Sequence, residues 1–220
     1  MVLVRIRTAL GGLGLAGLVG VALYWRKNPS ACPYGARGFL SMPRPIITTS
    51  RLLEILAPAP GERLLEVGPG TGFYTLDVAR QLEPNGVLQA FDIQPRMLDH
   101  TLRRAARAEV KNIVPRLGDA RMLPYADDHF DAAFLVTVLG EIPLKDQALA
   151  ELHRVVRHDG RVVIGELAGD PHMVGYSQLV DVAVRLDLQP DERVGGRLGY
   201  FARFRVNKPG AVAARRAENS

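Results

Sequence analysis

Cysteine is almost absent from this chain of 220 residues, which contains a single one, Cys32. One thiol forms no disulfide within the chain and builds no cysteine metal cluster. The other metal-ligating residue types form no group with the spacing of a metal site. We therefore expect a protein of a reducing compartment that binds no metal ion.

An excess of positive charge is missing from most of the chain, although the formal net charge is +5. Residues 1–60 hold seven of the 28 basic residues and one of the 23 acidic ones, which leaves 21 basic and 22 acidic residues in the remainder. No patch of lysine and arginine alternates with aromatic residues there. The sequence pattern of a protein that binds a phosphate backbone is therefore absent, and we expect no nucleic-acid partner.

Long hydrophobic runs are also lacking, with one exception near the N-terminus. Residues 9–25, ALGGLGLAGLVGVALYW, carry no charge over 17 positions and are flanked by Arg5 and Arg7 on one side and by Arg26 and Lys27 on the other. As a helix this run would be about 25 Å long, close to the thickness of a bilayer core. We predict a single-pass membrane anchor over residues 1–27, with the rest of the protein in the cytoplasm by the positive-inside rule. A cleaved signal peptide and a helix lying in the interface remain alternatives.

The segment after this run divides into a linker and a helix. Residues 28–44 are rich in proline, glycine and serine, as linkers are. Residues 45–56, PIITTSRLLEIL, place their apolar positions on one helical face and end before ProAlaProGly. We expect residues 28–60 to form a linker and a helix that covers the ligand site, although a plain packing helix fits the pattern as well. Residues 208–220 are expected to be a flexible tail.

The stretch LLEVGPGTGFYT, Leu64–Thr75, carries the strongest local signal in the sequence. An apolar run with an acidic residue, Glu66, is followed by Gly68, Gly70 and Gly72 and then by a helical pattern. Such a strand, glycine loop and helix start lets a ligand approach the backbone. A dinucleotide fingerprint would need its third glycine where Phe73 stands, so the spacing favours S-adenosylmethionine over NAD. Alone, the loop leaves a simple turn equally open.

The remainder alternates between strand and helix patterns, which predicts a parallel sheet covered by helices on both faces. The chain is long enough for one such core, and we expect one catalytic domain over residues 61–207. Ligands of these sheets bind beyond the carboxyl ends of the strands. The last two strands, at 192–198 and 199–206, are close enough to form an antiparallel hairpin at the sheet edge. The expected strands before them cover residues 64–67, 86–93, 112–119, 130–140 and 159–167, and the expected helices cover residues 73–82, 95–108, 145–157 and 174–188.

Three acidic residues follow one another at the ends of the expected strands: Glu66, Asp92 and Asp119. A sulfonium nucleoside brings an amino cation, a ribose diol and an adenine amine, and each of these needs an acceptor. Asp92 stands 20 positions after Gly72, the separation of a ribose-binding acid. Asp119 with Ala120 is the candidate for the adenine edge. The alternatives are a helix-capping role for Asp92 and a turn role for Asp119.

Four ordered motifs resemble those of class I S-adenosylmethionine-dependent methyltransferases, in particular small bacterial enzymes similar to ubiquinone and menaquinone C-methyltransferases. The resemblance covers about residues 61–207. It implies a Rossmann-like, doubly wound sheet of seven mostly parallel strands with an antiparallel C-terminal hairpin. The motifs are LLEVGPGTGFYT, FDIQPRML, GDARMLPYADDHFDAAFLVTVLGEIP and ELHRVVRHDGRVVIGEL.

The resemblance also implies roles for particular residues around the cofactor, S-adenosyl-L-methionine. The glycine loop would contact the methionine part, Asp92 the ribose, and the residues after the fourth strand, 137–141, the methyl-transfer pocket. The implied cofactor residues are Glu66, Gly68, Gly70, Gly72, Asp92, Ile93, Asp119, Ala120 and Thr137.

Methyl transfer from a sulfonium needs alignment and a water-poor pocket more than it needs catalytic side chains. If the acceptor has to lose a proton, Glu141, His172 and Tyr176 are the candidates, because they follow the fourth and fifth expected strands. Structural roles in their loops are the alternative for Glu141 and His172.

The motifs also restrict the chemical class of the methyl acceptor. The sequence VTVLGEIP lacks the Asn/Asp-Pro-Pro-aromatic motif of enzymes that methylate amides and nucleobases, and one cysteine disfavours arsenite. We expect O- or C-methylation of a small, hydrophobic or lipid-like molecule. A membrane-tethered protein that binds the cofactor without turnover is the alternative function. An NAD(P) oxidoreductase is disfavoured because no Tyr-x-x-x-Lys pair is present.

Overall fold

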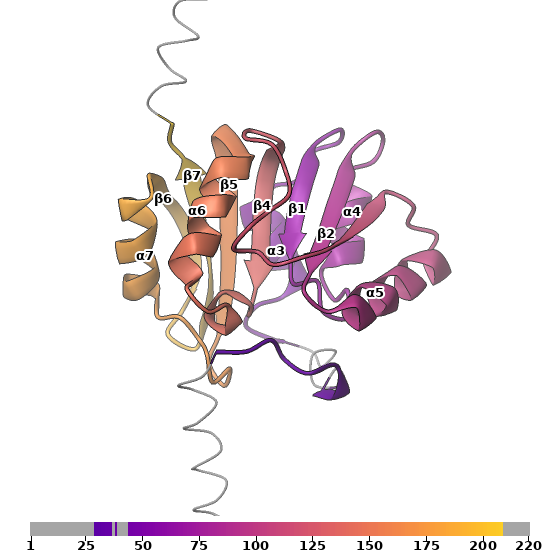
Figure 1. Cartoon of the computed structure of the whole chain (residues 1–220), viewed down its shortest axis with the longest axis horizontal. Helices are drawn as coiled ribbons and strands as arrows, with labels where there is room; N and C mark the ends of the chain where they lie inside the picture. The colour runs from indigo at the N-terminus through magenta and orange to yellow at the C-terminus, as the bar shows by residue number, and fades with distance from the viewer. Residues whose placement is uncertain (1–28, 37, 39–43, 209–220) are drawn as a thin grey trace, which may run out of the picture.

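A seven-stranded sheet forms the centre of the computed structural model, which describes residues 29–36, 38 and 44–208 (Figure 1). The strand order is β3-β2-β1-β4-β5-β7-β6. The strands are β1 (Arg63–Val67), β2 (Val87–Asp92), β3 (Ile113–Leu117), β4 (Phe130–Val136), β5 (Val156–Leu167), β6 (Leu188–Gly196) and β7 (Gly199–Val206).

The pairing confirms the predicted sheet. Strands β1 to β5 run parallel to one another, and β7 lies antiparallel between β5 and β6. From β1 the chain first adds β2 and β3 on one side and then returns to add β4 on the other. The point where this order reverses, between β1 and β4, is where open α/β sheets bind their ligands.

Helices cover both faces of this sheet and enclose two hydrophobic cores. Helices α6 and α7 pack on one face, and α3, α4 and α5 pack on the other. Figure 1 shows α6 in front of the sheet, with α3 and α4 behind it. The helices are η1 (Tyr34–Ala36), α3 (Thr49–Leu56), α4 (Thr75–Gln81), α5 (Pro95–Arg107), η2 (Leu139–Glu141), α6 (Lys145–Val155) and α7 (Tyr176–Arg185).

The central position of β4 follows from its composition. Its sequence FDAAFLV is apolar at every position except Asp131, and all the other side chains are buried. A strand that is buried on both faces reads as a continuous apolar run, because each face meets a layer of helices. Phe134 is fully buried between β1 and β5, where its residue partners are Glu66 and Val163.

Helix α3 begins later than the expected helix over residues 45–56. The Thr48 side chain accepts a hydrogen bond of 3.3 Å from the backbone N–H of Arg51, which fixes Thr48 as the N-cap. Ala57 ends the helix in the left-handed conformation, and its N–H donates to the carbonyl of Leu53. Helix α3 lies against β5, β6 and β7.

The predicted membrane anchor over residues 1–27 and most of the predicted tail lie outside the described residues. Within the described part of the chain, no helix has the length and apolar character that crossing a bilayer requires.

Replacing Phe134 by alanine tests the importance of the central strand. Phe134→Ala is expected to lower the free energy of unfolding by about 3–5 kcal/mol, because it leaves a cavity in a fully buried position. Urea denaturation followed by circular dichroism measures the change. Val184→Ala, at an exposed position on α7, is the control and is expected to change stability by less than about 0.5 kcal/mol. Equal effects of the two substitutions would contradict this account of the core.

Candidate active site

A cavity of about 280 Å³ opens at the carboxyl ends of β1, β2 and β4, at the point where the strand order reverses. This volume is near the lower end of the roughly 300–1,000 Å³ that small-molecule sites occupy. The cavity lies where the sequence predicts the ligand. Nine of the predicted site residues line it: Glu66, Gly68, Gly70, Asp92, Ile93, Asp119, Ala120, Thr137 and Glu141.

The glycine loop after β1 forms the floor of the cavity. Gly68 has a φ of +69°, and a Cβ atom placed there would lie 2.5 Å from a methyl carbon of Val138. Both the backbone conformation and the lack of space therefore require glycine at this position. The loop presents its main chain to the cavity, as the sequence predicts.

Helix α5 holds this loop from outside the cavity. The Thr101 hydroxyl donates to the carbonyl of Gly70 at 3.1 Å, and the Arg104 guanidinium donates to the carbonyl of Thr71 at 2.6 Å. Gly72, for which the resemblance implies a cofactor contact, is not among the residues that line the cavity. It faces α5 instead, where an added Cβ would lie 3.0 Å from the Thr101 methyl carbon.

Glu66 is the most deeply buried acidic residue in the cavity. Its side chain is 3% exposed, and its Oε2 atom has no hydrogen-bond partner among the described residues. Burial raises the pKa of this carboxyl to about 8, so the group is mostly protonated at neutral pH. A buried carboxyl with an unused oxygen in a cavity is suited to receive a cation or a hydrogen-bond donor.

Asp92, at the end of β2, is the second buried acid of the cavity. Its Oδ1 atom accepts a hydrogen bond of 2.8 Å from the backbone N–H of Gln94. Burial raises its pKa, although hydrogen bonds from the backbone act in the opposite direction. A carboxylate at this place is able to accept two hydrogen bonds from a diol.

The third acid is placed differently from the other two. Asp119 lies after β3 and forms an ion pair with Arg121, with a shortest N–O distance of 2.6 Å. This arginine lowers the pKa of the Asp119 carboxyl. Next to it, Ala120 is buried whereas Ile93 is 58% exposed, although both line the cavity. The ion pair with Arg121 uses part of the hydrogen-bond acceptor capacity of the Asp119 carboxylate.

The backbone after β4 turns sharply at Thr137, which also lines the cavity. Thr137 has a φ of 54°, a conformation that β-branched residues rarely adopt. Its N–H donates to the carbonyl of Gly165 at 2.8 Å, which ties this turn to β5. Backbone strain of this kind collects at ligand sites, because the surrounding structure has to maintain it.

Glu141 faces the same cavity from η2. Its Oε2 atom accepts a hydrogen bond of 3.1 Å from the backbone N–H of Cys32. Burial raises the pKa of Glu141 to about 7, and the nearby acids Asp170 and Asp92 add to this increase. A carboxyl that titrates near neutral pH is well matched to accepting a proton from a bound molecule.

The other two predicted proton acceptors, His172 and Tyr176, are not among the residues that line the cavity. The loop after β5 folds back on η2, so that the carbonyl of His172 packs against Gly140. The Tyr176 ring lies against Tyr200, with centroids 5.5 Å apart, and the Arg193 guanidinium lies 4.1 Å from it. The structure therefore places His172 beside η2 and Tyr176 against β7, and neither contributes to the cavity lining.

The segment before α3 supplies lining residues that the sequence did not indicate. Ser30, Ala31, Cys32 and Arg44 all line the cavity, whereas α3, the helix expected to cover the ligand site, contributes no lining residue. The Gln94 side chain donates to the carbonyl of Cys32 at 2.9 Å and fixes the segment in place. These contacts join residues more than 60 positions apart, which no local sequence pattern records.

Comparison with known proteins gives a family for this fold and site. The sequence pattern of the Methyltransferase domain family matches residues 58–183. The chain is 36% identical over 107 residues to a demethylmenaquinone methyltransferase of Lactobacillus johnsonii, covering 48% of this chain and 44% of that protein. It is 32% identical over 111 residues to an arsenite methyltransferase of Halobacterium salinarum, covering 50% of this chain and 28% of that protein. The matches thus span less than half the length of these relatives.

A solved structure shares the fold at lower sequence identity. The crystal structure of a SAM-dependent methyltransferase from Aquifex aeolicus matches with a TM-score of 0.73 and 16% identity. The match covers 80% of this chain and 100% of that chain. The fold is therefore that of a known methyltransferase.

Removing the carboxylate of Asp92 tests its predicted contact with the ribose. Asp92→Asn is expected to weaken binding of S-adenosylmethionine about 10- to 100-fold, because hydrogen bonds to a charged group contribute about 1.5–3 kcal/mol each. Isothermal titration calorimetry measures the affinity. Asp99→Asn, at an exposed position on α5, is the matched control and should leave it unchanged. If both variants bind equally well, Asp92 does not hold the ribose.

The raised pKa of Glu66 predicts a pH dependence of cofactor binding. A cation bound beside Glu66 favours its ionised form, so binding below pH 8 requires the group to lose a proton. The affinity should therefore increase by up to about tenfold per pH unit towards pH 8 and level off above it. Titrations of the wild type and of Glu66→Gln over this range isolate the effect, because the amide cannot titrate. Parallel pH profiles for the two proteins would show that the cation binds elsewhere.

Proposed function

This chain belongs to the Methyltransferase domain family, and on that premise we propose that it is an S-adenosylmethionine-dependent methyltransferase acting on a small, hydrophobic acceptor. The observation that carries the proposal is the buried carboxyl of Glu66, whose Oε2 atom is unpartnered among the described residues. It lines the cavity together with the exposed main chain of the glycine loop and the second buried acid, Asp92.

The residues of the cavity fit this cofactor. Glu66 and the glycine loop would hold the amino acid part, since a buried carboxyl and bare main chain suit an amino cation and a carboxylate. Asp92 would accept from the ribose hydroxyls, and Ile93 with Ala120 would contact the adenine. When bound, the sulfonium supplies a methyl group whose leaving group departs without charge.

The task left to the protein is alignment and exclusion of water. The apolar side chains of Val136, Val138 and Ile142 line the cavity after β4, and Phe73 and Tyr74 line it after the glycine loop. The segment of residues 30–32 borders the cavity as well. An acceptor bound among these side chains would be kept from water and held near the cofactor.

The apolar lining favours a quinone-like or lipid-like acceptor that is methylated at carbon or oxygen. A relative of this chain is named demethylmenaquinone methyltransferase, which is in keeping with an aromatic, hydrophobic acceptor. Another is named arsenite methyltransferase. The single cysteine of this chain disfavours arsenite, because trivalent arsenic is bound by several thiolates and one is not enough.

Glu141 is the candidate for removing a proton from the acceptor. It lines the cavity beside Ile142 and Pro143, and its pKa of about 7 allows it to accept a proton near neutral pH. Ionising a hydroxyl group of the acceptor would make the oxygen, or a conjugated carbon, more nucleophilic.

For localisation, we propose that the protein is bound to a membrane, as the sequence predicts. The uncharged run of residues 9–25 would anchor the chain in a membrane, with the methyltransferase domain in the cytoplasm, where the cofactor is made. Such an anchor would bring the cavity close to acceptors dissolved in lipid.

Transfer of an isotopically labelled methyl group tests the function. The full-length protein is incubated with labelled S-adenosylmethionine and either demethylmenaquinone or a total lipid extract, and the products are analysed by mass spectrometry. The proposal expects label in a lipid-soluble product. Tight cofactor binding with no labelled product in any extract would favour the alternative, a cofactor-binding protein without turnover.

Substitution of Glu141 separates its role in catalysis from its role in structure. Glu141→Gln is expected to slow methyl transfer about 100- to 10,000-fold and to leave cofactor affinity unchanged. The amide oxygen still accepts from the Cys32 N–H, so the local structure is kept. In the wild type the rate should rise as pH passes through about 7, where Glu141 ionises.

The control for this variant is Asp146→Asn, whose carboxylate lies on the surface 3.7 Å from Arg185. It should retain both the rate and its pH dependence. A Glu141→Gln enzyme with the wild-type rate would exclude Glu141 as the base.

A further inference from the structure

Exposed apolar side chains gather at the edge of the sheet where the cavity opens. Seven large hydrophobic residues are exposed in the described part of the chain, and five of them lie at the end of β3 or in the connections that follow β2, β3, β4 and β6. Met122 is 78% exposed and Leu198 is 67% exposed, the two highest values among them. The five, which we call the rim, are Ile93, Leu117, Met122, Leu144 and Leu198.

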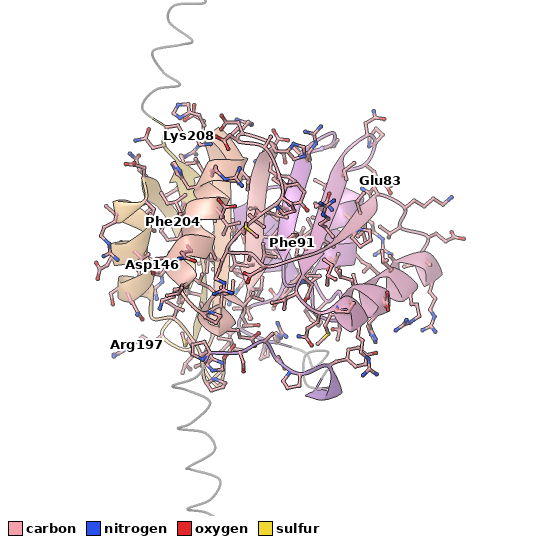
Figure 2. The ribbon with its side chains drawn as sticks, in the orientation of Figure 1. Glu83, Phe91, Asp146, Arg197, Phe204 and Lys208 are labelled. Atoms are coloured by element: carbon pink, nitrogen blue, oxygen red, sulfur yellow. The ribbon has the colours of Figure 1, made fainter. Side chains whose placement is uncertain are left out.

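The topology explains why these residues share an edge. Strands β2, β3 and β4 run parallel, so the connections that follow them all begin at the carboxyl edge of the sheet, and the Met122 N–H donates back to the carbonyl of Asp119, just after β3. Leu198 lies in the turn before β7, and Gly199 pairs with Leu167 at the carboxyl end of β5. Figure 2 shows Arg197, its neighbour, at the lower edge of the molecule, whereas Lys208 lies at the upper edge.

The acidic residues at this edge of the sheet differ in their exposure to solvent. The acids Glu66, Asp92 and Glu141 line the cavity and are largely withdrawn from solvent. Two acids that are more exposed, Asp119 at the border of the cavity and Asp146 at the start of α6, each lie within 4 Å of an arginine.

Three exposed arginines belong to elements that meet this edge. Arg96 lies in the first turn of α5 after β2, Arg193 lies on β6 over the ring of Tyr176, and Arg197 lies in the turn between β6 and β7. The rim therefore combines single apolar side chains with positive charge, the combination by which proteins bind the surface of anionic membranes.

The path of the chain into the domain gives an independent argument for a lipid partner. Residues 30–32 line the cavity, so the chain enters the domain beside the cavity opening. The uncharged run of residues 9–25 ends five positions before Ser30. At about 3.6 Å per residue, that distance is at most about 18 Å. A hydrophobic run so near in sequence to the cavity opening and a rim that favours lipid are both consistent with a lipid partner at this surface.

We propose that the rim rests on the surface of an anionic lipid bilayer and that the cavity opens towards the lipid. Contact of the rim with lipid does not require methyl transfer. Entry of a lipid-soluble acceptor through this opening rests on the function proposed above.

Quenching of a single tryptophan by brominated lipids tests the contact at the rim. Trp25, the one tryptophan of the chain, is replaced by phenylalanine, and Met122→Trp is introduced in the full-length protein. Vesicles contain phosphatidylcholine and phosphatidylglycerol, with or without bromine on the acyl chains. Val184→Trp is the matched control, because Val184 is also exposed but lies near the end of α7, which leads to the opposite edge of the sheet.

The proposal expects brominated lipid to quench the fluorescence of the Met122→Trp protein several-fold more strongly than that of the Val184→Trp protein. The quenching should be weaker in vesicles of phosphatidylcholine alone. Leu198→Trp, in the turn between β6 and β7, provides a second rim position and should behave like the first. Circular dichroism and cofactor titration verify that each variant is folded.

No quenching at either rim position, or equal quenching at the rim and at the control, would overturn the proposal. The labelled-methyl assay on the same proteins separates the two proposals. Rim quenching without methyl transfer would refute the proposed function alone, and methyl transfer without rim quenching would refute the lipid contact alone.

Discussion

The burial of a carboxyl group near the end of β1 is the constraint on which the rest of the site depends. Glu66 lies between two neighbouring strands and under a loop of main chain, and its Oε2 atom has no partner among the described residues. An unpartnered buried carboxyl costs free energy, so a folded protein retains one where it has a use. Its place in the cavity makes binding of a positively charged ligand the natural use.

The surrounding structure maintains this arrangement from several directions. The lack of a side chain at Gly68 lets Val138 approach the loop, and α5 holds the loop carbonyls through Thr101 and Arg104. The turn at Thr137 is tied to β5 by its hydrogen bond to Gly165. Preorganisation of this kind lets a ligand bind without a large loss of conformational entropy in the protein.

Sequence reasoning succeeded where a local pattern and the topology rule act together. Glu66, Asp92 and Thr137 each end or follow a parallel strand, so their place at one edge follows from the strand order alone. It failed to place residues whose position depends on the conformation of a loop. His172 and Tyr176 also follow a strand, but they lie against Gly140 and Tyr200 instead of the cavity.

Lining residues from distant segments were missed for a related reason. Cys32 meets Glu141 across 109 positions of the sequence, and Arg44 reaches the cavity from the segment before α3. Neither residue belongs to a motif, and neither has a spacing that could reveal the contact. Such pairs are specified by tertiary packing, which single-sequence patterns do not contain.

The central claim is that the carboxyl edge of this sheet binds a charged sulfur nucleoside. Parallel calorimetric titrations of the full-length protein with S-adenosylmethionine and with NADH test it most directly. The account predicts saturable binding of S-adenosylmethionine, displaced by S-adenosylhomocysteine, and no binding of NADH. Tight binding of NADH with none of S-adenosylmethionine would contradict it.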